Sequence, residues 1–100
     1  MHTRTIMLRR YRLAPGTVDE FMGWWTSSIP QLRAESGFTV DAAYVDREAE
    51  TFTWVLSYPG DRAAFDAADA LYSARPERAA AIAVAPLLID VSVEFPERVL

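Results

Sequence analysis

The chain lacks several residue types that catalytic and metal sites use most often. It contains no cysteine, no lysine and no asparagine, and its single histidine is His2, next to Met1. The missing cysteine excludes disulfides, thiolate nucleophiles, zinc ribbons and iron-sulfur clusters. The missing lysine excludes a Schiff-base enzyme. We interpret His2 as incidental because chain ends are often frayed, and we expect neither a metal nor an organic cofactor.

Basic runs and long apolar runs are also scarce. The formal charge is -4, and no basic run extends beyond residues 9–12, which argues against a nucleic-acid surface and against binding to an anionic membrane. No apolar run reaches the roughly 18 to 20 residues that a membrane helix needs, and no segment has the pattern of a secretory signal. We therefore expect a cytoplasmic protein without nucleic-acid or membrane partners.

The residues that are present indicate a folded protein of one domain, residues 1–100. Half of them are hydrophobic (51%) and 12% are aromatic, which is typical of globular proteins. A chain of this length has room for one small core. Turn signals and hydrophobic periodicity predict strands at 3–13, 38–46, 51–58 and 87–95, helices at 17–37 and 61–72, and a short helix within 73–85.

Local signals mark where the helices begin and end. Thr17 and Glu20 have the spacing of a capping box, in which both side chains accept backbone N-H groups. Asp61 is expected to cap the second helix, and Gly37 to end the first. The element order is β-α-β-β-α-β with an extra helical turn before the last strand. This order predicts a ferredoxin-like α+β fold, with a four-stranded antiparallel sheet and the helices on one face.

Alternation along the strands sorts their side chains onto two faces. One set is mostly apolar and aromatic, and we expect it beneath the helices. The other set mixes small, polar and acidic groups, and we expect it on the open face. The first set is Phe38, Val40, Ala42, Tyr44, Phe52, Trp54, Leu56, Tyr58, Leu87, Ile89, Val91, Val93 and Phe95. The second set is Thr39, Asp41, Ala43, Val45, Thr51, Thr53, Val55, Ser57, Leu88, Asp90, Ser92 and Glu94.

The first strand divides its arginines between these faces. Arg10 and Arg12 are assigned to the open face, where Asp41, Asp90 and Glu94 are available as ion-pair partners. Arg9 and Tyr11 then point toward the helices. An arginine there either reaches solvent at the sheet edge or needs a carboxylate, backbone carbonyls, an aromatic plane or a ligand.

The open face also carries too many apolar side chains to be left in water. A second copy of the chain is the simplest cover, so we expect a homodimer formed through this face, with charges setting the orientation. The apolar residues assigned to the face are Ile6, Leu8, Val45, Val55 and Leu88.

Four stretches of the sequence resemble one family: LRRYRLAPGT (8–17), GF (37–38), WVLSYPGDRAAF (54–65) and YSARPERA (72–79). They are similar to the NIPSNAP-type branch of the dimeric α+β barrel superfamily, whose first strand typically carries an L-R-x-Y-x-L-x-P-G pattern. The resemblance spans nearly the whole chain. It implies a dimer of ferredoxin-like subunits, each with a pocket between its sheet and its helices. Here the pattern falls on Leu8, Arg9, Tyr11, Leu13, Pro15 and Gly16.

The resemblance also suggests which activities suit the chain. Superfamily relatives include cofactor-independent monooxygenases of aromatic polyketides, haem-degrading monooxygenases, small-lactone isomerases and polyketide cyclases. The haem-degrading members use a histidine and an asparagine, and the cyclases and isomerases often use a histidine, so this chain lacks their groups. A cofactor-independent oxygenase needs mainly an aromatic pocket that excludes water and stabilises a substrate anion. Its substrate here would be a small aromatic or polyketide-like molecule.

The candidate catalytic residues are Arg9 and Tyr11. The candidate substrate-binding residues are Trp25, Tyr44, Trp54, Tyr58 and Tyr72. Core packing is the alternative role for each of these aromatic residues. Trp24 suits either a pocket wall or a dimer contact, and Asp41, Asp90 and Glu94 suit interface ion pairs or general bases. The alternative function is a non-catalytic homodimeric binding or assembly protein, and the sequence leaves open whether the chain is an enzyme.

Overall fold

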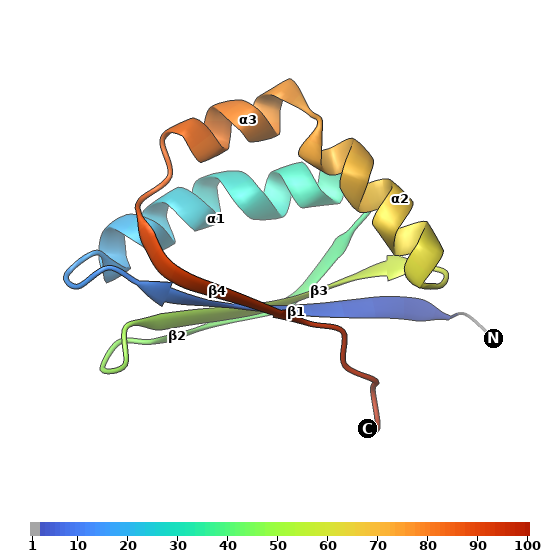
Figure 1. Ribbon diagram of the computed structural model, residues 1–100, viewed down its shortest axis with the longest axis horizontal. Helices are drawn as coiled ribbons and strands as arrows, with labels where there is room; N and C mark the ends of the chain where they lie inside the picture. Colours follow the sequence, from blue (N-terminus) through green and yellow to red (C-terminus); the bar gives the residue numbers. More distant parts are fainter. Residues whose placement is uncertain (1–2) are drawn as a thin grey trace.

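Three helices cover one face of a four-stranded sheet in the computed structural model, which describes residues 3–100 (Figure 1). His2 lies outside the described residues. The order of elements confirms the predicted one, and the extra helical turn is a separate short helix, α3. The elements are β1 (Arg4–Leu13), α1 (Val18–Glu35), β2 (Thr39–Asp46), β3 (Thr51–Pro59), α2 (Arg62–Ser73), α3 (Pro76–Ala83) and β4 (Leu88–Glu94).

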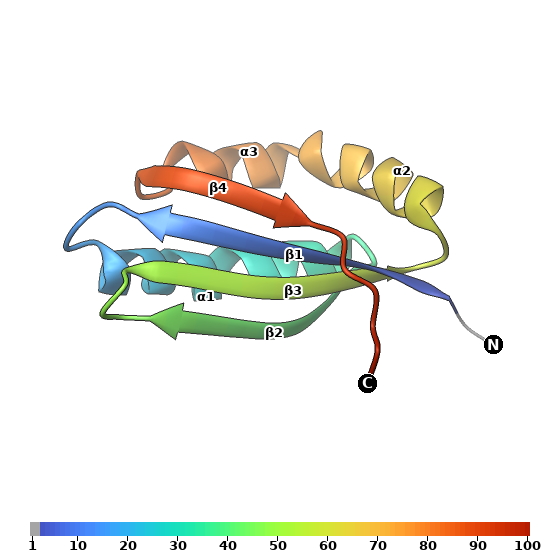
Figure 2. The ribbon, with the colours of Figure 1, turned by 60° about the horizontal axis from the view of Figure 1, so that its bottom comes forward.

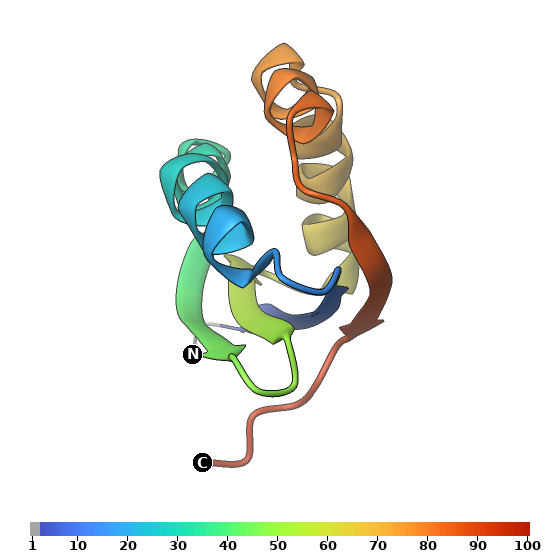
Figure 3. The same cartoon turned by 90° about the vertical axis from the view of Figure 1, so that its left-hand side faces the viewer.

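The sheet has the strand order β2-β3-β1-β4, and every neighbouring pair is antiparallel. This confirms the ferredoxin-like fold class. Figures 2 and 3 show the helices on one side of the sheet, while the C-terminal tail leaves β4 on the other side. No helix in the described part of the chain is both long and apolar enough to cross a membrane. In the part of the chain that the structure describes, the helices thus enclose one face of the sheet, and no helix covers the other.

The two predicted N-caps have different outcomes. The side chain of Asp61 accepts the backbone N-H of Ala64 at 3.0 Å, so this cap of α2 is confirmed. The capping box at Thr17 is wrong, although α1 does begin at Val18. The Thr17 hydroxyl turns back and donates to the Ala14 carbonyl at 2.7 Å. The backbone of Thr17 is not extended (φ -107°, ψ 10°), so its hydroxyl is not directed at the helix N-H groups.

The C-terminus of α1 ends in a Schellman motif at Gly37, whose φ of 89° favours glycine. The backbone N-H of Phe38 donates to the Arg33 carbonyl at 3.0 Å, and that of Gly37 donates to the Ala34 carbonyl at 3.1 Å. This turn brings Phe38 back against Arg33, and the guanidinium carbon lies 4.7 Å from the centre of the phenyl ring. The helix end thus places an arginine against the aromatic core.

A β-bulge in β2 corrects part of the predicted face assignment. Val40 pairs with Leu56 but Ala42 pairs with Val55, so Asp41 is an extra residue in the strand. An extra residue moves all following side chains to the opposite face. Ala43 and Val45 therefore lie on the helix side, and Ala42 and Tyr44 on the open side. The expectation that Tyr44 lies beneath the helices is wrong, and its side chain is 66% exposed.

A second bulge has the same effect in β4. Arg12 pairs with Asp90 and Leu13 with Leu88, which leaves Ile89 as the extra residue. Leu88 consequently packs against the core, although it was predicted on the open face. Leu87 and Ile89, which were predicted beneath the helices, are exposed instead. The predicted assignment of side chains to the two faces of the sheet thus fails in both edge strands, at the bulge in each.

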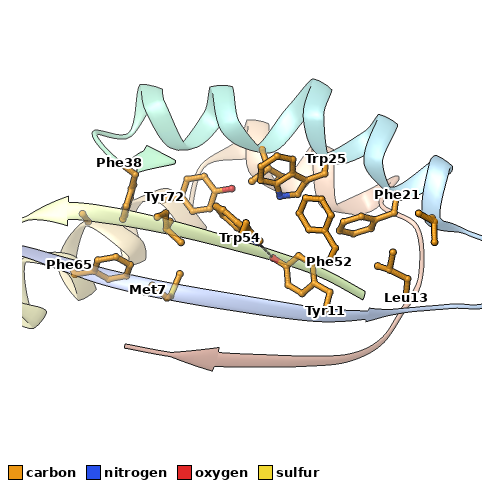
Figure 4. Close-up of a cluster of buried hydrophobic side chains, with 14 residues drawn as sticks. Met7, Tyr11, Leu13, Phe21, Trp25, Phe38, Phe52, Trp54, Phe65 and Tyr72 are labelled. Carbon is orange, nitrogen blue, oxygen red and sulfur yellow. Dashed lines mark hydrogen bonds between the residues drawn. The ribbon is translucent and has the colours of Figure 1, made fainter. Parts of the chain in front are cut away.

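The core lies between the central strands and α1, and it is largely aromatic (Figure 4). Phe52 sits in its middle, with ring centres 4.9 Å from Trp25 and 5.1 Å from Phe21. The central strands β1 and β3 have no bulge between them, and their predicted alternation is confirmed. Their core-facing residues are Met7, Tyr11, Leu13, Phe52, Trp54 and Leu56.

Candidate functional site

A cavity of about 380 Å³ lies between the helix-covered face of the sheet and the helices. Its walls come from β1, β3, β4, all three helices and the segment that connects α3 to β4. Its volume falls in the lower part of the range of roughly 300 to 1,000 Å³ that small-molecule pockets span. The cavity therefore has room for a small ligand, and its lining decides which chemistry it suits.

The floor of the cavity is a hydrogen-bonded group on β1 and β3. Arg9 and Tyr11 are two residues apart in β1, so their side chains share one face, and Trp54 pairs directly with Arg9. The Tyr11 oxygen accepts two hydrogen bonds, from Arg9 Nε at 3.0 Å and from Trp54 Nε1 at 2.9 Å. Figure 4 shows the tyrosine and the indole pointing toward each other. With both donors on its oxygen, the Tyr11 hydroxyl hydrogen is left for a third partner.

Arg33 enters the cavity wall from the last turn of α1 and is almost completely buried, with 5% of its surface exposed. Aromatic rings surround its guanidinium group. The guanidinium carbon lies 3.8 Å from the centre of the Tyr72 ring, 4.7 Å from that of Phe38 and 5.8 Å from that of Trp54. Cation-π contacts of this kind gain strength when water is excluded. They hold the guanidinium in one place.

One carboxylate offsets part of the buried charge of Arg33. Asp69 of α2 accepts a hydrogen bond from Arg33 Nη1 at 2.7 Å. Burial lowers the pKa of the Arg33 guanidinium, the hydrogen bond to Asp69 counteracts part of this shift, and the nearby positive charge of Arg9 adds to the lowering. Arginine nevertheless stays protonated in proteins. A permanent positive charge is thus kept in the cavity wall.

A third arginine, Arg78, reaches the cavity from α3. The helix is held against α1 by Trp24, whose indole Nε1 donates to the Ala81 carbonyl at 2.9 Å. Among residues 3–100, the buried Nε atoms of Arg33 and Arg78 have no hydrogen-bond partner. Trp24 itself lines the cavity, which agrees with the pocket-wall role among its two predicted roles.

Comparisons with solved structures agree on one fold. A NIPSNAP-like domain protein from Burkholderia xenovorans is 15% identical, with a TM-score of 0.84 over 99% of this chain and 89% of that chain. A NIPSNAP family protein of unknown function from Agrobacterium tumefaciens is 12% identical, with a TM-score of 0.84 over 99% of this chain and 93% of that one. The chain has a NIPSNAP-like fold. The resemblance inferred from the sequence is confirmed at this level.

A third structure links the NIPSNAP-like fold to an enzyme name. It is a proposed antibiotic biosynthesis monooxygenase from Bacteroides thetaiotaomicron, 16% identical, with a TM-score of 0.70 over 98% of this chain and 91% of that chain. No protein-family model matches the sequence, and no curated protein matches it. Likenesses at these identities establish the fold, and the activity has to be argued from the cavity.

The NIPSNAP-like fold gathers four of the seven predicted site residues in the cavity wall: Arg9, Tyr11, Trp54 and Tyr72. The other three lie elsewhere. Trp25 is buried in the core, Tyr44 is on the opposite face of the sheet, and Tyr58 borders a separate hollow beside Arg75. The L-R-x-Y pattern of the first strand thus supplies both polar residues of the cavity floor.

Sequence reasoning missed Arg33 and Arg78. A signal for Arg33 was present, because Val18, Trp25, Ile29 and Arg33 lie on one helical stripe and all four are buried. Arg78 likewise lies four residues before Ile82, on the same side of α3, and both line the cavity. An arginine on an apolar stripe is a sign of a functional or paired charge. The described residues include no cluster of three or more histidines and acids that could hold a metal ion.

Proposed function

We propose that the protein binds a small aromatic or polyketide-like molecule in the cavity between its sheet and its helices. One observation supports this most strongly: Tyr11, in the cavity wall, accepts hydrogen bonds from both Arg9 and Trp54. A tyrosine in that state can direct its own hydrogen only at a further acceptor. Aromatic walls with a few fixed polar groups are typical of small-molecule sites.

A cofactor-independent monooxygenation is the reaction that this site suits best. In such a reaction the enolate or phenolate form of the substrate gives electrons to O₂, one oxygen atom enters a CH₂ group as a carbonyl, and the other leaves as water. The protein has to exclude water and stabilise the substrate anion, tasks that the aromatic walls and the Arg9 and Tyr11 pair can perform. The structural relative named as a proposed monooxygenase supports this candidate.

The binding proposal is tested with a thermal-shift screen of phenols, quinols and polyketide fragments, because a ligand that prefers the native state must raise the melting temperature. Tyr11→Phe should remove the fixed hydroxyl and weaken the hit about tenfold. Tyr44→Phe is the matched control, since Tyr44 is on the other face of the sheet. If no compound raises the melting temperature, or if both variants lose the ligand equally, the proposal is wrong.

We also propose that two copies of the chain pair through their open sheet faces. The bulges change the list of apolar residues there, since Val45 and Leu88 face the core. Ile6, Leu8 and Val55 remain on the open face, and Ala42 and Tyr44 join them. These side chains favour a covered surface.

The charges of the open face support the same pairing. Arg10 and Arg12 lie on the central strand β1, while Asp90 and Glu94 lie on the edge strand β4. Arg12 and Asp90 are opposite each other in the backbone register of the two strands. None of the ion pairs found within residues 3–100 involves these four side chains. A face with a basic centre and an acidic edge can complement itself across a two-fold axis.

Sedimentation of the wild type and of Leu8→Asp tests the dimer. The wild type should sediment as a dimer at micromolar concentrations, and the variant, which places a charge at the centre of the proposed interface, as a monomer. Leu71→Asp is the control, because Leu71 is an exposed leucine that belongs to α2, on the other side of the molecule from the open face. A monomeric wild type contradicts the dimer. A dimer without any ligand in the thermal-shift screen would favour the non-catalytic assembly protein.

A further inference from the structure

We infer that the ligand of the cavity carries a carboxylate on an aromatic or alicyclic body, and that Arg9, Arg33 and Arg78 bind this carboxylate. The inference rests on the proposed function, since it specifies the chemistry of the molecule that the cavity would bind. It is carried by the charge of the cavity wall, by two unpartnered arginine donors, and by the apolar nature of the remaining wall.

The cavity wall has a strong excess of positive charge. Three of the ten arginines of a chain with net charge -4 line it, and no aspartate or glutamate does. Asp69, which pairs with Arg33 from behind the cavity, is the only acid that forms an ion pair with any of the three among the described residues. Like charges gathered in a low-dielectric site repel one another unless an anion neutralises them. The cavity therefore favours an anionic ligand.

Two arginine Nε atoms at this cavity also lack acceptors. The Nε atoms of Arg33 and Arg78 are buried, and neither has a hydrogen-bond partner among residues 3–100. A buried donor without an acceptor is costly. The aromatic rings around Arg33 fix its guanidinium in advance, so little conformational freedom is lost when an acceptor binds.

Arg75 shows how the same fold treats an arginine with a structural role. Its guanidinium binds Glu35 and Glu77, and it donates to the Leu32 carbonyl and to the Ser36 hydroxyl. These contacts join the end of α1 to the start of α3. Arg75 thus has several acceptors, two of them acids, whereas within residues 3–100 only one of the three cavity arginines, Arg33, pairs with an acid. The difference indicates that the cavity arginines serve an external anion.

The rest of the wall selects the body of the anion. Trp24, Ile29, Leu88 and Val91 are among the lining residues, and most of the wall is apolar. A carboxylate offers two oxygens that match guanidinium donors in pairs. A dianionic phosphate would lose the water around a second negative charge and has no apolar body to contact the rest of the wall, so its transfer into this cavity is more expensive. An apolar carboxylate fits both parts of the wall.

The test compares 2-naphthoate with 2-naphthamide, which have nearly the same shape but differ in charge. Isothermal titration calorimetry of the wild-type protein should show naphthoate binding at least tenfold more tightly than naphthamide. Arg9→Gln and Arg78→Gln should each weaken naphthoate binding about tenfold to hundredfold, as expected for a charge-assisted hydrogen bond. They should change naphthamide binding much less. Arg33 is kept, because its removal would also disrupt the packing of Phe38 and Tyr72.

Arg47→Gln is the control, since Arg47 lies on the surface and pairs with Asp19. It should leave both affinities unchanged. Melting temperatures and circular dichroism establish whether each variant is folded. Because two cavity variants are made, the test still works if one of them fails to fold. The inference is supported if either cavity variant weakens the binding of naphthoate and the control variant does not.

Three further outcomes would contradict the inference, and they distinguish its failure from that of the proposed function. Equal binding of naphthoate and naphthamide would overturn the inference of a carboxylate ligand, but the proposal of a small-molecule site would stand. No binding of either compound up to about 10 mM, together with a negative thermal-shift screen, would overturn both. Inorganic phosphate that displaces naphthoate at equal concentration would overturn the choice of a carboxylate over a phosphate.

Discussion

The two faces of the sheet use the same strands for opposite purposes. Beneath the helices, β1 contributes Arg9 and Tyr11 to an aromatic cavity, while on the open side it contributes Arg10 and Arg12 to a polar surface. The environment of the arginines differs accordingly. Arg33 is enclosed by rings on the covered side, whereas within residues 3–100 the Arg10 side chain makes one 3.3 Å hydrogen bond, to Thr53 on the open side. The proposed ligand site and the proposed dimer surface therefore lie on opposite sides of β1, on residues one position apart.

Two tyrosines on opposite sides of the sheet give the largest contrast: Tyr72 of α2 packs on the covered side, and the bulge in β2 places Tyr44 on the open side. Tyr72 is 3% exposed and Tyr44 is 66% exposed. Tyr72→Ala should lower the free energy of unfolding by about 3 to 5 kcal/mol, because it removes a buried ring that packs on Arg33 and Phe38. Tyr44→Ala should cost less than about 0.5 kcal/mol in the monomer. Urea denaturation measures both, and equal losses would mean that Tyr44 faces the core after all.

Two neighbours in β3 sharpen the comparison with less change in volume. Leu56 is completely buried on the covered face, and Val55 lies on the open face. Leu56→Ala should cost about 3 kcal/mol. Val55→Ala should cost clearly less, and its cost should depend on protein concentration if the open face is a dimer interface. A concentration-independent loss for Val55→Ala as large as that for Leu56→Ala would remove the distinction between the faces.

Two aspartates of α2 test the charge beneath the helices. Asp69 binds the buried Arg33, and Asp66 binds the exposed Arg62 at 2.9 Å. Asp69→Ala should cost about 2 kcal/mol, which is less than the roughly 3 to 5 kcal/mol of a fully buried pair because solvent reaches part of Asp69. Asp66→Ala should cost about 0.5 kcal/mol or less. Thermal and urea unfolding should rank the two variants in this order, and the reverse order would contradict the burial argument.

The sequence predicted the central strands well because period-two alternation holds wherever a strand is regular. Tyr11, Phe52, Trp54 and Leu56 all lie on the side that the alternation assigned to them. The edge strands were predicted less well, because Asp41 and Ile89 lie within regular alternating runs that contain no glycine or turn signal to indicate a bulge. A bulge is set by pairing between strands, and that information is not contained in either strand alone.

The candidate site was predicted in part for a similar reason. Arg9 and Tyr11 stood out because charged and polar groups beneath the helices are unusual, and the cavity contains both. Arg33 was hidden by its neighbour Leu32, which completes the apolar stripe of α1 equally well by spacing. Arg78 lies in an alanine-rich segment whose position over the sheet depends on tertiary packing with α1 through Trp24. Packing of this kind links distant parts of the chain.

The bulge at Asp41 affects any residue-by-residue comparison of this chain with its relatives. Two sequences can have equal strand lengths and matching hydrophobic patterns, yet place corresponding positions on opposite sides if only one of them carries the additional residue. A gap-free alignment would then equate Tyr44 with a pocket residue of another protein. Functional assignments in β2 and β4 should therefore be transferred from superposed backbones and not from a sequence alignment alone. The same holds when positions in these strands are selected for a mutant library.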